Sequence, residues 1–122
     1  MKIAITSQGK DLQSQVDPRF GRASWFIVAD TETGQFEAHD NTQNVEAVQG
    51  AGIQAAQNIA RHGVACLLTG HCGPNAFRTL SAAGIQVIVG VQGTVAETIE
   101  RFKRGELVPA DRPDVEGHWA QR

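Results

Sequence analysis

The segment from Leu67 to Phe77 constrains the fold of this chain more than any other. It reads Leu-Leu-Thr-Gly-His-Cys-Gly-Pro-Asn-Ala-Phe, which is the pattern of a buried strand that ends in a glycine-rich turn and opens directly into a helix. Pro74 suits the first helical position, where its missing N–H leaves no hydrogen bond unmade. Gly70 and Gly73 permit backbone conformations and close approaches that a side chain would block. The segment therefore predicts a strand–turn–helix unit.

Apolar runs separated by turn residues predict five strands and three helices along the chain. The strands are expected at residues 2–7, 25–30, 35–39, 64–69 and 85–89, and the helices at residues 51–61, 74–83 and 94–105. The turn Thr31–Gly34 predicts a hairpin between the second and third strands. Thr94 and Glu97 form the capping-box pattern that starts the last helix.

This order of elements predicts an α/β fold with one mixed five-stranded sheet and helices on its faces. The expected spatial order of the strands is 3-2-1-4-5, with strand 2 antiparallel. Strands 1, 4 and 5 then run parallel, so the loops Ser7–Lys10, Gly70–Gly73 and Gly90–Gly93 meet at one edge of the sheet. Ligands of open α/β sheets bind beyond the carboxyl ends of the strands. We therefore expect the binding site at that edge.

Length and composition narrow the class of protein. The 122 residues fit one domain with one core, which we expect at residues 1–107, followed by a polar tail at 108–122. A formal charge of −2 gives no basic field for nucleic acid. Because apolar runs fall short of the roughly 20 residues of a membrane span and the start lacks a signal-peptide pattern, we expect a cytoplasmic protein with no membrane partner.

The turn before the second helix carries candidate ligands. A helix start offers free N–H groups and a partial positive charge to an anion, and here Gly70, Gly73 and Asn75 would provide the backbone contacts. The imidazole of His71 and the thiol of Cys72 are soft ligands for metals. Two adjacent residues cannot close a four-ligand zinc site. The turn therefore predicts a site for an anionic, sulfur-rich metal species, and the alternative is a surface turn that only caps the helix.

A second candidate motif is Asp17-Pro18-Arg19-Phe20-Gly21-Arg22-Ala23. Its two arginines flank a Phe-Gly turn, and a guanidinium presents a fork of donors suited to an oxyanion or a sulfido edge. The alternative is a structural loop in which Asp17 caps a turn and an arginine pairs with a carboxylate. Both interpretations stay open at this point.

The remaining sequence patterns give weaker support for a functional site. The turn Gly90–Thr94 lacks the lysine of a phosphate-binding P-loop, so a helix-capping turn is favoured. A two-metal nuclease needs several carboxylates at strand ends, and the first strand has none. A cysteine hydrolase is weakly supported, because the side chains of neighbouring residues usually diverge. Cys66 is expected to be buried within its strand, and His62 is expected to be a cation at a helix C-terminus.

The residues quoted above, with Met1–Ser7, Gly50–Ala56 and Ala83–Ile85, resemble the dinitrogenase iron–molybdenum cofactor biosynthesis family, which includes NifX and the C-terminal domain of NifB. The resemblance covers about residues 1–107. It implies a ribonuclease-H-like three-layer fold without nuclease chemistry and non-covalent binding of molybdenum- or iron-containing sulfur clusters. One subgroup, the orange proteins of sulfate reducers, is similar in size and carries a molybdenum–copper sulfide cluster.

These observations favour a non-enzymatic carrier for a molybdenum-containing metal–sulfur cluster, of the Mo–Cu sulfide or Fe–Mo type. Arg19, Arg22 and the N–H groups from Gly73 to Asn75 would neutralise the cluster, and His71 or Cys72 would supply a soft contact. Proteins that donate or accept the cluster are the expected partners. The alternative from another class is a small enzyme domain that binds phosphate or a nucleotide in the same crevice.

Overall fold

The computed structural model describes residues 1–41 and 51–110. The described strands are β1 (Lys2–Ser7), β2 (Trp25–Asp30), β3 (Phe36–Asp40), β4 (Cys66–Leu68) and β5 (Gln86–Ile88), and the helices are α2 (Ala51–Ala60), α3 (Pro74–Ala82) and α4 (Val95–Lys103). The predicted order of elements is confirmed. The loop expected between the third strand and the first helix lies mainly in residues 42–50, outside the described residues.

The strands form one mixed sheet in the order β3-β2-β1-β4-β5. β2 is antiparallel to both β1 and β3, whereas β4 is parallel to β1 and to β5. The predicted strand order and the antiparallel second strand are therefore confirmed. The carboxyl ends of β1, β4 and β5 lie at the same edge of the sheet, as the predicted topology requires.

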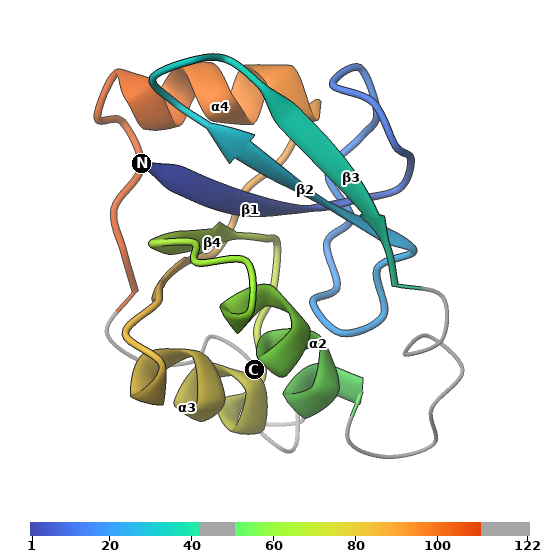
Figure 1. Cartoon of the computed structure of the whole chain (residues 1–122), viewed down its shortest axis with the longest axis vertical. Coiled ribbons are helices and arrows are strands. Elements are labelled where there is room, and N and C mark those ends of the chain that lie inside the picture. Colours follow the sequence, from blue (N-terminus) through green and yellow to red (C-terminus); the bar gives the residue numbers. More distant parts are fainter. Residues whose placement is uncertain (42–50, 111–122) are drawn as a thin grey trace.

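The two faces of the sheet are covered by different helices, with α4 on one side and α2 and α3 on the other (Figure 1). Alternate residues of β1 enter the two layers, because successive side chains of a strand point to opposite faces. Ile3 and Ile5 pack in the cluster that includes Val95 of α4. Ala4 packs with Ile59 of α2 and other residues of the opposite layer. The central strand is thus buried on both faces, as a parallel-sheet strand should be.

Local sequence signals set the ends of α3 and α4. At α4, the Thr94 hydroxyl accepts a hydrogen bond from the Glu97 amide at 3.1 Å, and the Glu97 carboxylate accepts one from the Thr94 amide at 2.8 Å. This is the predicted capping box. Gly105, with φ +76°, follows α4 and ends it in the left-handed conformation. At α3, Pro74 is the first helical residue and Gly73 is the N-cap.

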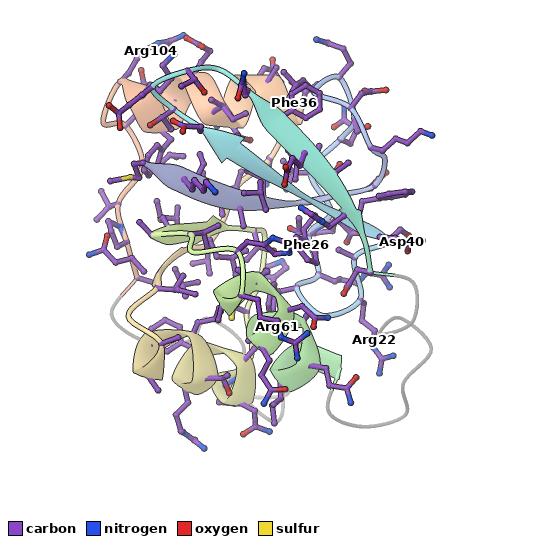
Figure 2. The ribbon with its side chains drawn as sticks, viewed as in Figure 1. Arg22, Phe26, Phe36, Asp40, Arg61 and Arg104 are labelled. Atoms are coloured by element: carbon purple, nitrogen blue, oxygen red, sulfur yellow. The ribbon has the colours of Figure 1, made fainter. Side chains whose placement is uncertain are left out.

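Phe26 of β2 lies in the layer between the sheet and α2 (Figure 2). It is buried, and it belongs to the same cluster as Ala56 and Ile59 of α2. A buried phenylalanine contributes about 1.5–3 kcal/mol through removal of its surface from water. Phe26 therefore anchors the hairpin of β2 and β3 to the helical layer.

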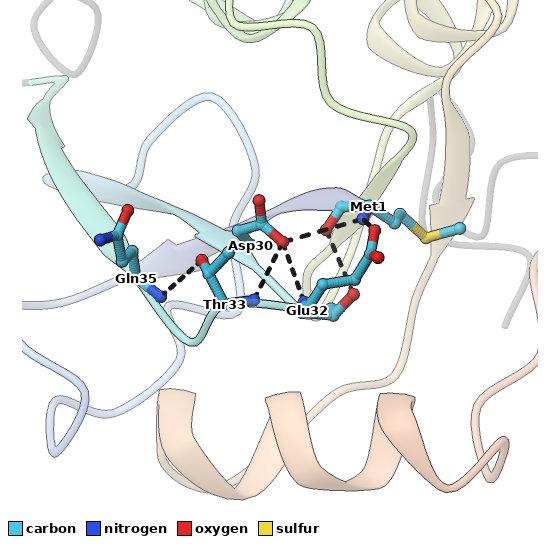
Figure 3. Close-up of polar contacts among 6 residues, drawn as sticks. Met1, Asp30, Glu32, Thr33 and Gln35 are labelled. Atoms are coloured by element: carbon cyan, nitrogen blue, oxygen red, sulfur yellow. Dashed lines mark hydrogen bonds and ion pairs between the residues drawn. The ribbon is translucent and has the colours of Figure 1, made fainter.

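The hairpin turn between β2 and β3 is held by a carboxylate and by the amino terminus (Figure 3). The Asp30 carboxylate accepts hydrogen bonds from the amides of Glu32 and Thr33, at 2.9 and 3.4 Å. Gly34 takes φ +78°, a conformation that favours glycine. The Met1 amino group donates to the Glu32 carboxylate at 2.8 Å. These contacts fix the register of β3 at the edge of the sheet.

The segment predicted as a polar tail begins against the sheet. The Ala110 amide donates to the Val87 carbonyl at 2.7 Å, which places residue 110 alongside β5. Residues 111–122 lie outside the described residues. Among the helices of the described ranges, none is long and apolar enough to cross a membrane.

Candidate functional site

Three loops meet at the carboxyl ends of β1, β4 and β5. The Gly90 amide donates to the Gly70 carbonyl at 2.8 Å, which joins the loops after β4 and β5. The Val16 amide donates to the Gly93 carbonyl at 2.9 Å, which joins the loops after β1 and β5. The structure therefore brings together the three glycine-bearing loops that the topology placed at this edge.

The two candidate motifs are paired through their backbones. The His71 amide donates to the Pro18 carbonyl at 2.7 Å, and the Phe20 amide donates to the His71 carbonyl at 3.2 Å. A Cβ atom at Gly70 would lie 2.6 Å from the Pro18 Cα atom, closer than packed atoms approach. Gly70 is thus the residue that lets the two loops touch. As a consequence, Arg19 and His71 occupy paired backbone positions.

Threonine hydroxyls that the sequence reasoning missed secure this junction. The Thr6 hydroxyl donates to the Asp17 carbonyl at 2.7 Å and lies 2.8 Å from the Thr69 hydroxyl. Both threonines are buried, at the ends of β1 and β4. A polar residue that closes an otherwise apolar strand was the signal available in the sequence. Because the buried hydroxyls are satisfied by each other and by the loop, they bind the site's backbone to the sheet.

Arg19 is both paired and accessible. Asp17 is only 4% exposed, and its carboxylate accepts a hydrogen bond from the Arg19 amide at 3.0 Å. The Arg19 Nε atom lies 3.6 Å from the same carboxylate oxygen, while the arginine side chain is 65% exposed. The structural interpretation of this motif therefore holds for Asp17. An ion pair to an exposed arginine contributes at most about 1 kcal/mol, so most of the guanidinium's donors remain available to a ligand.

Arg22 follows in the same loop and extends from it in Figure 2. Its residue is half-buried, and the preceding Gly21 is buried and has φ +88°. That positive φ is the turn expected of the Phe-Gly pair. Arg22 thus shares the loop with Arg19. The backbone pairing with the turn after β4 joins Arg19 to His71 and, among the described residues, does not extend to Arg22.

The start of α3 is open. Gly73 has φ −75° and ψ 172°, and a Cβ atom built on it meets nothing within 4 Å. Its conformation is accessible to any residue, which differs from the predicted need for glycine there. Asn75 is exposed in the first turn. Since the first amides of a helix have no partner in a preceding turn, this end offers donors to an anion.

Cys72, the candidate thiol ligand of the turn, is buried. It is 1% exposed and lies in the same cluster as Ala76 and Leu80 of α3. Its Sγ atom lies 3.8 Å from the Gly73 carbonyl oxygen. His71, one residue before, is exposed. The imidazole therefore faces solvent at the site, and the thiol packs beneath the helix.

The other predicted cysteine and histidine have contrasting outcomes. Cys66 is buried as predicted, and burial raises the pKa of its thiol to about 11. His62 was expected to be a cation, but burial and then the neighbouring His39 lower the pKa of its imidazole. The cationic form expected for His62 is thus disfavoured, because the half-buried imidazole at the end of α2 packs against His39 of β3.

A family model confirms the resemblance seen in the sequence. The model described as "Dinitrogenase iron-molybdenum cofactor" matches residues 1–105, which include both site motifs and all described strands and helices. The chain belongs to this family.

The chain is similar to two solved structures and to one further protein sequence. The apo form of the orange protein from Desulfovibrio gigas is 43% identical, covers 93% of this chain and 96% of its own, and superposes with a TM-score of 0.91. A Thermotoga protein assigned to NifB is 42% identical, covers 88% of this chain and 91% of its own, and has a TM-score of 0.77. An uncharacterized protein from Methanocaldococcus jannaschii is 28% identical over 109 residues, which are 88% of this chain and 89% of that protein.

Proposed function

We propose that this chain binds an anionic metal–sulfur cluster non-covalently and carries it, without catalysing a reaction on it. The main support for this proposal is the backbone pairing of Arg19 with His71. The pair lies directly before the open start of α3, and the chain belongs to the iron–molybdenum cofactor family. In this proposal the guanidinium of Arg19, the imidazole of His71 and the first amides of α3 act together on one cargo. We further propose that the cluster contains molybdenum, as a Mo–Cu sulfide or an Fe–Mo type.

The charges of the site suit such a cargo. Cluster sulfides at the surface are anionic acceptors, and each needs a donor or a positive charge. Arg19 and Arg22 supply guanidinium donors in a planar fork. The amides of Gly73 and Asn75 supply fixed donors at the positive end of the α3 dipole. Because Gly73 carries no side chain, a bulky anion can approach these amides closely.

The two soft residues have different parts in this proposal. The exposed His71 can contact a metal of the cluster without any rearrangement of the turn. Cys72 can contribute a thiolate only after its side chain leaves the core cluster, so the turn would have to change conformation on binding. We therefore assign the first metal contact to His71 and a conditional one to Cys72.

A carrier also needs proteins that supply and receive its cargo. We propose that such a donor and acceptor act on this chain in the cytoplasm and approach the exposed edge where the three loops meet. We propose no nucleic-acid partner, because a chain with a net charge of −2 has no broad basic surface to attract one.

Reconstitution tests the proposal directly. The apo protein is incubated with tetrathiomolybdate and a copper salt, or with a molybdenum–iron–sulfur cluster, and passed through a gel-filtration column. A visible charge-transfer spectrum that coelutes with the protein supports the proposal, and Arg104→Ala, directly after the end of α4, serves as the matched arginine control. A thermal shift with inorganic phosphate or nucleotides, and no retained chromophore, would instead establish the phosphate-binding alternative.

A further inference from the structure

Outside the candidate site, Glu37, His39 and His62 form a compact group of ligand-bearing side chains. One ligand atom of each lies within 4.8 Å of the corresponding atoms of the other two. The His39 Nε2 atom is 3.2 Å from a Glu37 carboxylate oxygen, and the two imidazole ring centroids are 4.0 Å apart. None of the three belongs to the loops that form the cluster site.

The register of the hairpin explains why the first two meet. His39 of β3 is opposite Phe26 of β2, and Glu37 is opposite Val28. Residues directly opposite in an antiparallel pair share a face, and Phe26 and Val28 are both buried in the α2–α3 layer. Glu37 and His39, two residues apart, therefore lie on the face of the sheet that the helices α2 and α3 cover.

The end of α2 brings the third residue. The His62 amide donates to the Ile59 carbonyl at 3.0 Å, and Gly63 then reverses the chain with φ +69°. Phe26 supports both imidazoles, with ring centroids 5.6 Å from His39 and 6.0 Å from His62. Two imidazoles from distant segments are thus held against one buried ring.

We propose that Glu37, His39 and His62 bind one divalent transition-metal ion of the zinc class, separately from the metal–sulfur cluster. Two imidazole nitrogens and one carboxylate oxygen are a familiar ligand set for Zn²⁺, which leaves a fourth position for water. Mg²⁺ and Ca²⁺ prefer sites built from oxygen ligands. A zinc-class ion, which accepts nitrogen ligands, therefore suits these three side chains better than Mg²⁺ or Ca²⁺ does.

The distances fit such an ion with small side-chain movements. In tetrahedral coordination with bonds of about 2.0–2.1 Å, ligand atoms lie about 3.4 Å apart. The His39–Glu37 pair is already at 3.2 Å. Glu37 is 73% exposed and His39 is 28% exposed, so both can adjust their torsions. Binding would link the edge strand β3 to the end of α2, which are joined in sequence through residues 42–50.

The experiment uses the full chain, freed of metal with a chelator and without any metal–sulfur cluster. Zn²⁺ is titrated by calorimetry, and Co²⁺ is titrated by visible absorption as a spectroscopic substitute. We expect one equivalent of each ion, a rise of the thermal midpoint with Zn²⁺, and no thiolate-to-cobalt charge-transfer band. A thiolate band, or no binding at micromolar protein, would overturn the proposal.

Matched variants locate the ion. We expect His39→Gln and His62→Gln each to weaken Zn²⁺ binding by at least about tenfold, since even the loss of a ligand's hydrogen-bond partner costs 10–100-fold. His118→Gln controls for the number of histidines and should bind normally. If His71→Gln abolishes binding, the ion sits at the cluster site and the proposal fails.

Folding is controlled separately. His62→Gln changes a packed residue, so its thermal midpoint without metal is compared with that of the parent protein. Glu37→Gln changes an exposed residue and gives a second, independent test. We expect this variant to fold normally and to bind Zn²⁺ more weakly. An unchanged affinity for Zn²⁺ would show that the Glu37 carboxylate is not a ligand. Because the Glu37, His39 and His62 variants leave Arg19 and His71 intact, failure of the zinc proposal does not count against the proposed cluster binding.

Discussion

The two glycines of the turn after β4 have different roles at the scale of single residues. Gly70 faces Pro18 so closely that a methyl group would collide with its backbone, whereas Gly73 faces open space. The same residue type thus serves packing in one case and access for a ligand in the other. From the sequence, both glycines are expected to provide the same two properties, conformational freedom and close approach, because the pattern alone does not show what surrounds a glycine.

Substitution of each glycine by alanine separates these roles. We expect Gly70→Ala to lower the free energy of unfolding by about 1–3 kcal/mol, as overpacking of a well-packed site does. Gly73→Ala should change it by no more than about 0.5 kcal/mol and yet weaken binding of the thiomolybdate–copper cluster. Urea denaturation and cluster titration measure the two effects. A Gly70→Ala protein as stable as the parent would show that the loops can separate without cost.

The arginines of the first motif make a second prediction. Arg19→Ala and Arg22→Ala should each weaken cluster binding by about 1.5–3 kcal/mol, the range for hydrogen bonds that involve a charged group. The unfolding free energy should fall by about 0.5 kcal/mol or less, since the exposed Arg19–Asp17 ion pair contributes little.

Arg104→Ala provides the comparison, because Arg104 is exposed at the end of α4 and pairs there with Glu106. Affinities are obtained from the visible absorption of the bound cluster. Early melting with normal affinity in the Arg19 and Arg22 variants would make the motif purely structural.

The thiols give a third prediction. Cys66 and Cys72 are both buried, and burial raises the pKa of Cys66 to about 11. Since the thiolate is the reactive form, neither cysteine should react with a thiol reagent at pH 8 in the folded apo protein, and both should react after unfolding. Rapid labelling of Cys72 in the folded protein would show that the turn opens spontaneously.

Cluster spectra complete the test of the cysteines. Cys66→Ala should leave the spectrum of the reconstituted cluster unchanged, because Cys66 lies within β4 on the α4 face. Cys72→Ala should retain binding through the backbone donors, and its spectrum should shift only if sulfur ligates a metal. An unchanged spectrum and affinity would confine the metal contact to His71.

At the scale of elements, the start of α4 followed the sequence more closely than the ends of β4 and β5 did. The capping box of α4 was predicted at Thr94 and Glu97 and is present. The predicted strands at 64–69 and 85–89 shorten to three residues each in β4 and β5. A cap is a local contact between residues three apart, whereas a strand extends only as far as its neighbour pairs with it.

The cap of α4 yields a prediction with a pH dependence. Thr94→Ala should lower the unfolding free energy by about 0.5–2 kcal/mol.

Hydrogen bonds from Thr94 lower the pKa of Glu97 below its ordinary value of 4.5. A lowered carboxylate pKa stabilises the fold above the ordinary pKa, and that contribution is lost as the pH falls through the folded value.

Glu97→Gln should therefore be less stable than the parent at pH 7, and the difference should shrink as the pH falls below the ordinary glutamate pKa of 4.5 and through the lowered value of the folded protein. Urea denaturation at several pH values measures it. The control is Glu100→Gln, which changes another exposed carboxylate of α4. Equal pH profiles for the parent and Glu97→Gln would mean that the capping carboxylate does not act through its charge.

At the scale of the whole molecule, the sequence predicted the topology and only part of the site. A hairpin and two strand–helix units leave few ways to order five strands, so the order 3-2-1-4-5 followed from local patterns. That topology places the loops after β1 and β4 at one edge, but it fixes neither the pairing of Arg19 with His71 nor the burial of Cys72. Contact between His39 and His62 depends on the register of β3 and on where α2 ends, and neither is encoded in a local motif.

The buried hydrogen bonds among Thr6, Thr69 and the loop at Asp17 also bear on the rate at which cargo is captured. Loops that are fastened to the sheet before a ligand arrives need no slow ordering step. Capture would then proceed at a rate set by diffusion and by the attraction of the arginines for an anion. Stopped-flow absorption should show an association rate constant that falls with ionic strength, with little change in the dissociation rate constant.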